Sequence, residues 1–207
     1  MVRIEIRKGQ WPILLFNLII LAVFFTHFIA GKNYEFVLYV GVIVVFLGIF
    51  IYTNSRVHFP NALLWGLSFW ALMHLAGGSF YINGQKLYEL ILVSVWEQHE
   101  VFRYDQFVHI FGFAAATIVM FYVLKPLLRK DLNGWLALSI VVVAAGLGVG
   151  AFNEIVEFIA TILIPETGVG GYLNTSLDLV ANFIGAIIAI LLIRFTNKDI
   201  CRRMTRS

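Results

Sequence analysis

The sequence predicts an all-α membrane protein, a single polytopic bundle of about six transmembrane helices. The chain has 207 residues, of which 60% are hydrophobic and 13% charged, and its mean hydropathy is +0.87. An average soluble protein is roughly 45–50% apolar and 25% charged. A soluble fold of this composition would lack the polar residues needed to cover its surface, whereas lipid accepts outward-facing apolar side chains. At roughly 20 residues per span, this length allows about six crossings within one domain, residues 1–207.

The apolar runs give the elements in order. We expect membrane-spanning helices over residues 11–30, 34–53, 60–78, 105–125, 134–164 and 175–195. The first run follows basic residues, as a secretory signal does, but it is too long and lacks an A-x-A cleavage pattern. We therefore interpret it as an uncleaved span. Pro60 and Pro165 stand at helix boundaries, where a missing N–H is tolerated.

The longest connection predicted opposite the termini joins the third and fourth spans. In it, Asn83-Gly84 is flanked by residues that favour strands. Both positions suit a type I′ turn, which requires positive φ at its two central residues. We expect a small hairpin-like cap over the bundle here.

Basic residues predict the orientation, because cytoplasmic loops retain Lys and Arg. Of the fifteen basic residues, only Lys32, Lys86 and Arg103 fall on the side opposite the termini. The others are Arg3, Arg7, Lys8, Arg56, Lys125, Arg129, Lys130, Arg194, Lys198, Arg202, Arg203 and Arg206. We expect a protein of a prokaryotic cell membrane with both termini in the cytoplasm. The net charge of +3 then reflects membrane orientation, and we expect no nucleic-acid partner.

Ionisable residues inside the predicted spans gather in the outer half of the membrane. Asp105 and His109 are four residues apart at the start of the fourth span, and Glu154 and Glu157 are three apart near the end of the fifth. Each such spacing places two side chains on one helix face. Asp178 and Asn182 open the sixth span in the same way, and His74 lies in the outer part of the third.

Such a cluster needs compensation, because two carboxylates one helical turn apart cannot both ionise cheaply in a low dielectric. A divalent metal ion is one solution, held by Asp105, His109, Glu154 and Asp178. This mixture of oxygen and nitrogen ligands suits zinc, manganese, iron or magnesium. A proton or ion relay is a second solution. A ligand-free polar network that locks the helices together is a third.

Four segments resemble a known family. They are His74-Leu75-Ala76-Gly77-Gly78-Ser79-Phe80, Arg103-Tyr104-Asp105-Gln106-Phe107-Val108-His109, Phe152-Asn153-Glu154-Ile155-Val156-Glu157 and Asp178-Leu179-Val180-Ala181-Asn182-Phe183-Ile184-Gly185-Ala186. In order and spacing they resemble the motifs of YjdF-like integral membrane proteins, a family without an established activity. The last two are more distantly similar to VanZ-like proteins, which are linked to glycopeptide resistance. The resemblance implies the same helical fold and the same polar positions.

Our leading hypothesis is a metal-dependent hydrolase that acts on a lipid or lipid-linked substrate. Glu157 would be the general base and His74 would bind substrate or act as an acid. The alternatives are a small proton- or ion-coupled transporter or permeability factor, and a structural membrane protein. A transporter should have a polar route to the inner face, yet the inner halves of the predicted spans carry no ionisable residue. The oligomeric state is open.

Overall fold

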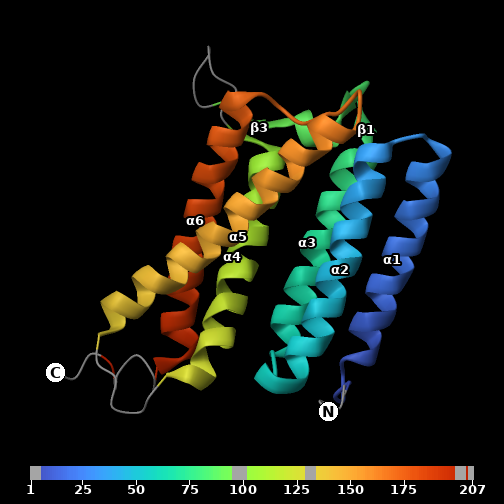
Figure 1. The fold of residues 1–207 in the computed structure, drawn as a ribbon. Helices are drawn as coiled ribbons and strands as arrows, with labels where there is room; N and C mark the ends of the chain where they lie inside the picture. Colours follow the sequence, from blue (N-terminus) through green and yellow to red (C-terminus); the bar gives the residue numbers. More distant parts are fainter. Residues whose placement is uncertain (1–5, 95–101, 129–133, 199–203, 205–207) are drawn as a thin grey trace.

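A computed structural model describes residues 6–94, 102–128, 134–198 and 204. Six α-helices account for most of these residues: α1 (Trp11–Ala30), α2 (Tyr34–Val57), α3 (Asn61–Ser79), α4 (Tyr104–Leu124), α5 (Trp135–Leu163) and α6 (Tyr172–Thr196). They lie side by side in one bundle, with α5 tilted across the others (Figure 1). The all-α prediction is confirmed, and each helix matches one of the expected runs.

Five of the helical segments are long and apolar enough to cross a membrane: α1, α2, the segment Tyr104–Leu127, α5 and α6. The sixth helix, α3, has 19 residues and runs alongside α2 (Figure 1). It is not among these five segments, so its crossing of the membrane stays a prediction.

Three groups of buried apolar side chains hold the bundle together, one of them at Phe59, Leu63, Ala115 and Val119, where α3 meets α4. Phe24, Phe28, Phe36 and Tyr39 pack with residues of α3 in the first half of the chain. A second group joins α4, α5 and α6 near the chain ends. Many other large apolar side chains are exposed on all six helices, as expected where the surface faces lipid rather than water.

The predicted cap is confirmed at the end of the bundle opposite the termini (Figure 1). Strands β1 (Tyr81–Ile82) and β2 (Gln85–Lys86) pair in antiparallel fashion across the Asn83-Gly84 turn, with φ of 53° and 83° at these two residues. A short 3₁₀ helix, η1 (Leu87–Glu89), follows. Strands β3 (Ile91–Val93) and β4 (Phe102–Arg103) form a second pair that leads directly into α4. A further 3₁₀ turn, η2 (Lys125–Leu127), follows the end of α4 and contains Pro126.

Both termini lie at the same end of the bundle (Figure 1). Arg7 fastens the N-terminal end, donating to Asn54 Oδ1 at 3.1 Å and to the Phe59 carbonyl at 2.7 Å. Of the basic residues used to predict orientation, Arg3, Arg129, Lys130, Arg202, Arg203 and Arg206 lie outside the described residues. The cytoplasmic location of the termini stays a prediction.

Candidate functional site

His109 is the centre of the polar cluster, and α4 positions it one turn below Asp105. The first turn of α4 is fixed by Gln106, whose Oε1 accepts a hydrogen bond from the Arg103 N–H at 3.0 Å. A carboxylate in this turn is favourable beside the positive end of the helix dipole. Asp105 Oδ1 lies 3.5 Å from His109 Nε2. The i, i+4 spacing therefore brings the two side chains together as the sequence predicts.

Helix α6 supplies Asp178 and Asn182, whose side chains are fully buried against α4. His109 Nδ1 and Asn182 Oδ1 are 2.9 Å apart, and Gln106 Nε2 donates to Asp178 Oδ1 at 2.6 Å. If Asn182 Oδ1 accepts the Nδ1 proton, Nε2 keeps its lone pair and points to the Asp105 side of the site. An amide acceptor on one imidazole nitrogen is the arrangement that orients metal-ligating histidines.

Asn174 links the carboxylates of the two helices. Its Nδ2 donates to Asp105 Oδ2 at 3.2 Å and to Asp178 Oδ2 at 2.6 Å. One amide thus bridges a residue of α4 and a residue of α6 that are far apart in the sequence. The bridge still leaves lone pairs on both carboxylates, since each ionised oxygen can accept more than one hydrogen bond.

Helix α5 closes the cluster with Glu154 and Glu157. Glu154 Oε1 lies 3.9 Å from His109 Nδ1, and the side chain is 9% exposed. Both Glu154 oxygens are buried without a hydrogen-bond partner among the described residues. Glu157 differs, because its Oε1 accepts from Asn153 Nδ2 at 2.8 Å. Gly150, one turn before Glu154, lets α5 approach α6, since a Cβ there would meet the Asn182 side chain.

The described residues contain two groups whose spacing fits a metal ion, and they share His109. One is Asp105, His109 and Asp178, and the other is His109, Glu154 and Glu157. Within each group, one ligand atom per residue lies within 4.8 Å of the others. Three of the four residues predicted as metal ligands, Asp105, His109 and Asp178, therefore come together from α4 and α6. The fourth, Glu154, joins His109 in the second group, near Nδ1 of the imidazole. Glu157, predicted as the base, lies beside them.

His74 stands apart from these two groups, on α3. Its ring stacks on Trp70 at a centroid distance of 5.6 Å, and its Nδ1 is 2.5 Å from the Tyr88 hydroxyl of η1. Burial raises the pKa of Tyr88 well above its usual value, so the hydroxyl keeps its proton. Tyr88 is thus the donor and His74 Nδ1 the acceptor, which orients the imidazole by a residue of the cap.

Two cavities meet beside the cluster, and of its residues Asp105 and Glu157 line their walls. The first, here called the polar chamber, has a volume of about 250 Å³ and lies under the cap; among its walls are Glu35, Lys86, Tyr88, Arg103, Asp105 and Asn174. The second, the apolar slot, has about 90 Å³ and runs between α2, α3, α4 and α5; among its walls are Ile43, Phe46, Phe50, Trp70, Phe113 and Phe152. Tyr39, His74 and Glu157 line both.

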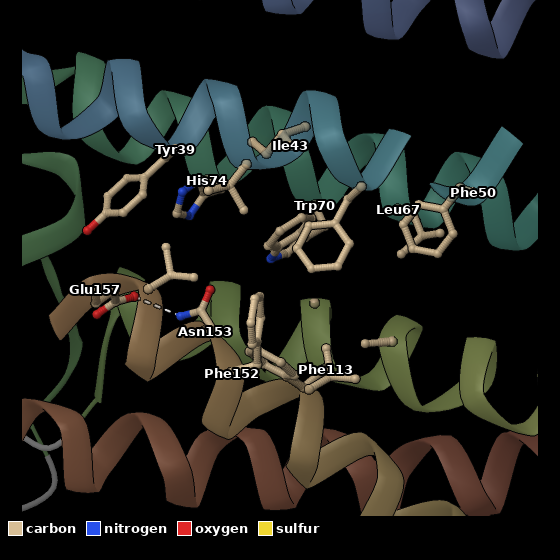
Figure 2. A pocket seen from close by; sticks show the side chains of 16 residues that line it. Tyr39, Ile43, Phe50, Leu67, Trp70, His74, Phe113, Phe152, Asn153 and Glu157 are labelled. Atoms are coloured by element: carbon tan, nitrogen blue, oxygen red, sulfur yellow. Dashed lines mark hydrogen bonds between the residues drawn. The ribbon is translucent and has the colours of Figure 1, made fainter. Parts of the chain in front are cut away.

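Figure 2 shows this junction at one end of the apolar slot. Tyr39 and His74 face Glu157 and Asn153 there, while Phe50 and Leu67 lie at the opposite end. The site therefore changes from charged and polar to wholly apolar along one direction. Such a gradient matches an amphiphile, whose head group and hydrocarbon chain need opposite surroundings.

Sequence reasoning missed several residues of the site. Tyr39 and Tyr88 contribute hydroxyls to the junction from an apolar run and from the cap, and nothing in the sequence distinguishes them from packing residues. Gln106 and Asn174 carry a usable signal, because Asn174 precedes Asp178 by four residues and Gln106 follows Asp105 directly. Residues on the same helix face as a predicted ligand are candidates to orient it.

The model of a protein family described as predicted membrane protein (DUF2238) matches residues 12–199, which include all six helices apart from the first residue of α1. This agrees with the YjdF-like resemblance, whereas the VanZ-like resemblance stays a prediction. No curated protein and no solved structure matches the chain.

Proposed function

The chain belongs to the DUF2238 family of membrane proteins, and from this premise we propose that it is a metal-dependent hydrolase of a lipid or lipid-linked substrate. The observation that carries the proposal is the Glu154 carboxylate. Both its oxygens are buried without a hydrogen-bond partner among the described residues, and Oε1 lies 3.9 Å from His109. A buried carboxylate without a partner is costly, so it requires a cation or a proton.

The surrounding residues fit a divalent metal ion. Asp105 and Asp178 offer carboxylate oxygens beside His109 in one group, and Glu154 offers its carboxylate beside His109 in the other. Carboxylate oxygens with an imidazole nitrogen suit zinc, manganese, iron or magnesium. Gln106, Asn174 and Asn182 hold three of these four side chains by hydrogen bonds, as supporting residues do in known metal sites. Glu154 is the one ligand without such support, and the ion would supply its partner.

The residues at the cavity junction suit hydrolysis. A bound divalent ion would polarise the scissile group and acidify water at neutral pH. Glu157 lines both cavities and can accept a proton from a water molecule there, with Asn153 orienting its carboxylate. His74 faces the same space and, held by Tyr88 at Nδ1, can act through its other nitrogen on the substrate or the leaving group.

Two alternatives fit these observations less well. A ligand-free polar network that only joins the helices would leave the Glu154 oxygens without partners. A transporter needs a polar route beyond the cluster, but the apolar slot ends at Phe50 and Leu67. Buried polar side chains deeper in the described part of the bundle, such as Asn17 and Ser68, hydrogen-bond each other at 2.6 Å.

Metal analysis of protein purified without chelator tests the proposal. We expect a divalent ion that raises the melting temperature, and Asp105→Ala, His109→Ala and Glu154→Ala should each lose the ion and this rise. A ligand at a hundred times its Kd stabilises a protein by about 2.7 kcal/mol. Glu166→Ala is the control, because Glu166 is exposed and lies after α5, outside the cluster. Metal below about a tenth of an equivalent, without stabilisation by added zinc, manganese or magnesium, would refute the metal site.

A further inference from the structure

The shape of the two joined cavities restricts which ligand the site can bind. The binding of this ligand is a separate inference, and only its cleavage rests on the proposed function. We propose that the site binds a single-chain amphiphile with a zwitterionic head group, taken sideways from the lipid between α2 and α5. The hydrocarbon chain of the amphiphile would lie in the apolar slot, and its head group would lie in the polar chamber. The bond joining them would then lie at Tyr39, His74 and Glu157, the residues common to both cavities.

The size of the apolar slot favours one chain over two. Its volume is about 90 Å³, and helices α2, α3, α4 and α5 all contribute to its walls. From Tyr39 to Phe50 it follows α2 for about 16 Å, at 1.5 Å per helical residue. A narrow space of this kind admits a single hydrocarbon segment. A lipid with two chains would leave its second chain outside.

The polar chamber has charges of both signs. Lys86 and Arg103 line it together with Glu35, Glu89 and Asp105. Lys86 Nζ lies 6.0 Å from the centroid of the Phe36 ring, and the Glu35 carboxylate accepts from the Gly168 N–H at 2.6 Å. These contacts hold a cation and an anion in place on neighbouring walls. A head group with one positive and one negative charge is complementary to such walls, whereas an anion alone would meet the acidic residues.

The position of Phe152 indicates that the entrance to the apolar slot lies on the side of the bundle. Its ring lines the apolar slot and is also 49% exposed on the outside of α5. It contacts Phe46 of α2 edge-to-face, with 6.1 Å between ring centroids. One pair of aromatic side chains therefore separates the slot from the surrounding lipid at this point. Rotation of Phe152 would open the slot to a chain in the membrane.

The cleavage step is an ester hydrolysis in which every atom and proton is accounted for. Glu157 accepts a proton from water, the water oxygen bonds to the ester carbonyl carbon, and the bond from that carbon to the head-group oxygen breaks. The proton that Glu157 took from water passes to the released head-group oxygen, which leaves as the alcohol and restores the Glu157 carboxylate. The products are a fatty acid and the head-group alcohol. No oxidant or other co-reactant is needed.

Photolabelling in nanodiscs tests the binding site directly. The probe is a palmitoyl lysophosphatidylcholine with a diazirine in its chain, and crosslinked residues are identified by peptide mapping. We expect labelling on slot residues such as Phe46 and Phe113, and competition by unlabelled lysophosphatidylcholine but not by dipalmitoyl phosphatidylcholine. Ala116→Phe, which fills the slot, should lower this labelling by about tenfold, whereas Ala22→Phe on the exposed face of α1 should not.

A second pair of variants tests the entrance at Phe152. Phe152→Ala should speed labelling of the slot, and Phe158→Ala, an exposed phenylalanine of α5 that does not line it, should leave the rate unchanged. Labelling confined to the lipid-facing surface, or equal competition by the two-chain lipid, would overturn the proposal. Glu154→Gln distinguishes the proposed binding site from the proposed hydrolase function. This variant should lose metal and ester cleavage, yet it should still be labelled in the slot. Slot labelling in a metal-free wild type would leave the binding site standing and refute the hydrolase.

Discussion

Glu154 and Glu157 lie one helical turn apart on α5, yet they have different surroundings. Glu154 points to His109 and has no hydrogen-bond partner among the described residues, while Glu157 is held by Asn153 and reaches both cavities. A carboxylate without partners suits a metal ligand. A carboxylate at the edge of open space suits a base, because a base must reach the proton that it removes. The difference between the two roles comes from position and not from residue type.

We therefore expect Glu157→Gln to separate metal binding from turnover. The variant should retain the divalent ion and slow fatty-acid release from lysophosphatidylcholine by about 10²–10⁴-fold, the usual contribution of a general base. Metal content and product release are measured on the same preparation. Glu166→Gln, a change at an exposed acid, should alter neither quantity. If Glu157→Gln releases the metal, Glu157 is a ligand and the base must be another residue.

A second prediction for a single residue concerns Tyr88 and the pH dependence of the protein's stability. Burial raises the pKa of its hydroxyl in the folded protein, so the folded state binds the proton more tightly than the unfolded state does. The stabilisation is complete below the unfolded pKa of about 10 and declines as pH rises above it. Tyr88→Phe should remove this part of the alkaline loss of stability. It should also cost about 1 kcal/mol at neutral pH, because the hydrogen bond to His74 is lost.

Melting temperatures between pH 7 and 11 provide the measurement. Tyr172→Phe is the matched control, since Tyr172 is 90% exposed and should follow the wild type throughout. Identical pH profiles for the wild type and Tyr88→Phe would contradict the burial of this hydroxyl.

At the scale of the elements, the site depends on how closely α6 approaches α4. Gly185 of α6 faces the α4 backbone, where an added Cβ would collide with the Ile110 carbonyl oxygen and lie 2.9 Å from the Ala114 nitrogen. Backbone atoms cannot move aside as a flexible side chain can. The same close approach carries Asp178 and Asn182 to Gln106 and His109. Helix packing and site geometry are thus a single feature.

Gly185→Ala should consequently destabilise the protein by about 1–3 kcal/mol, the usual cost of overpacking a dense core. It should also weaken metal binding, although residue 185 is no ligand. Gly148→Ala is the control: nothing lies within 4 Å of its added Cβ, and alanine is the better helix former. Thermal unfolding with and without added metal measures both effects. A stable, metal-loaded Gly185→Ala protein would show that the helices have room to separate.

For the whole molecule, the question is which side of the membrane the cavities face. Lys86, Tyr88 and Glu89 of the cap line the polar chamber. The cap lies at the end of the bundle opposite the termini (Figure 1). With the basic residues near the termini in the cytoplasm, the chamber would open toward the outer leaflet. This assignment needs all six helices to cross, including α3, which is not among the five candidate membrane spans.

Topology reporters test the orientation. A reporter at either terminus should give a cytoplasmic signal, and one inserted at Asn83-Gly84 should give the opposite signal. The insertion point is an exposed turn, so a reporter there should leave the helices intact. A cytoplasmic signal from this insertion would place the site at the inner leaflet and change the pool of lipid available to it.

The sequence by itself determined the helical membrane fold, the limits of the helices to within a few residues and the hairpin at Asn83-Gly84. These features depend on neighbours along the chain: runs of apolar residues, proline positions and a turn that needs positive φ. Helical spacing also identified Asp105 with His109, Glu154 with Glu157 and Asp178 with Asn182 as pairs sharing a face.

Only the tertiary structure decided how these pairs combine. Periodicity fixes a face of a helix but not the rotation of that helix against its neighbours, which follows from close packing at sites such as Gly150 and Gly185. For the same reason, the Gln106–Asp178 and Asn174–Asp105 contacts, the Tyr88–His74 hydrogen bond and the junction of the two cavities were beyond the sequence. Each joins residues distant along the chain, and such contacts exist only once the helices have packed.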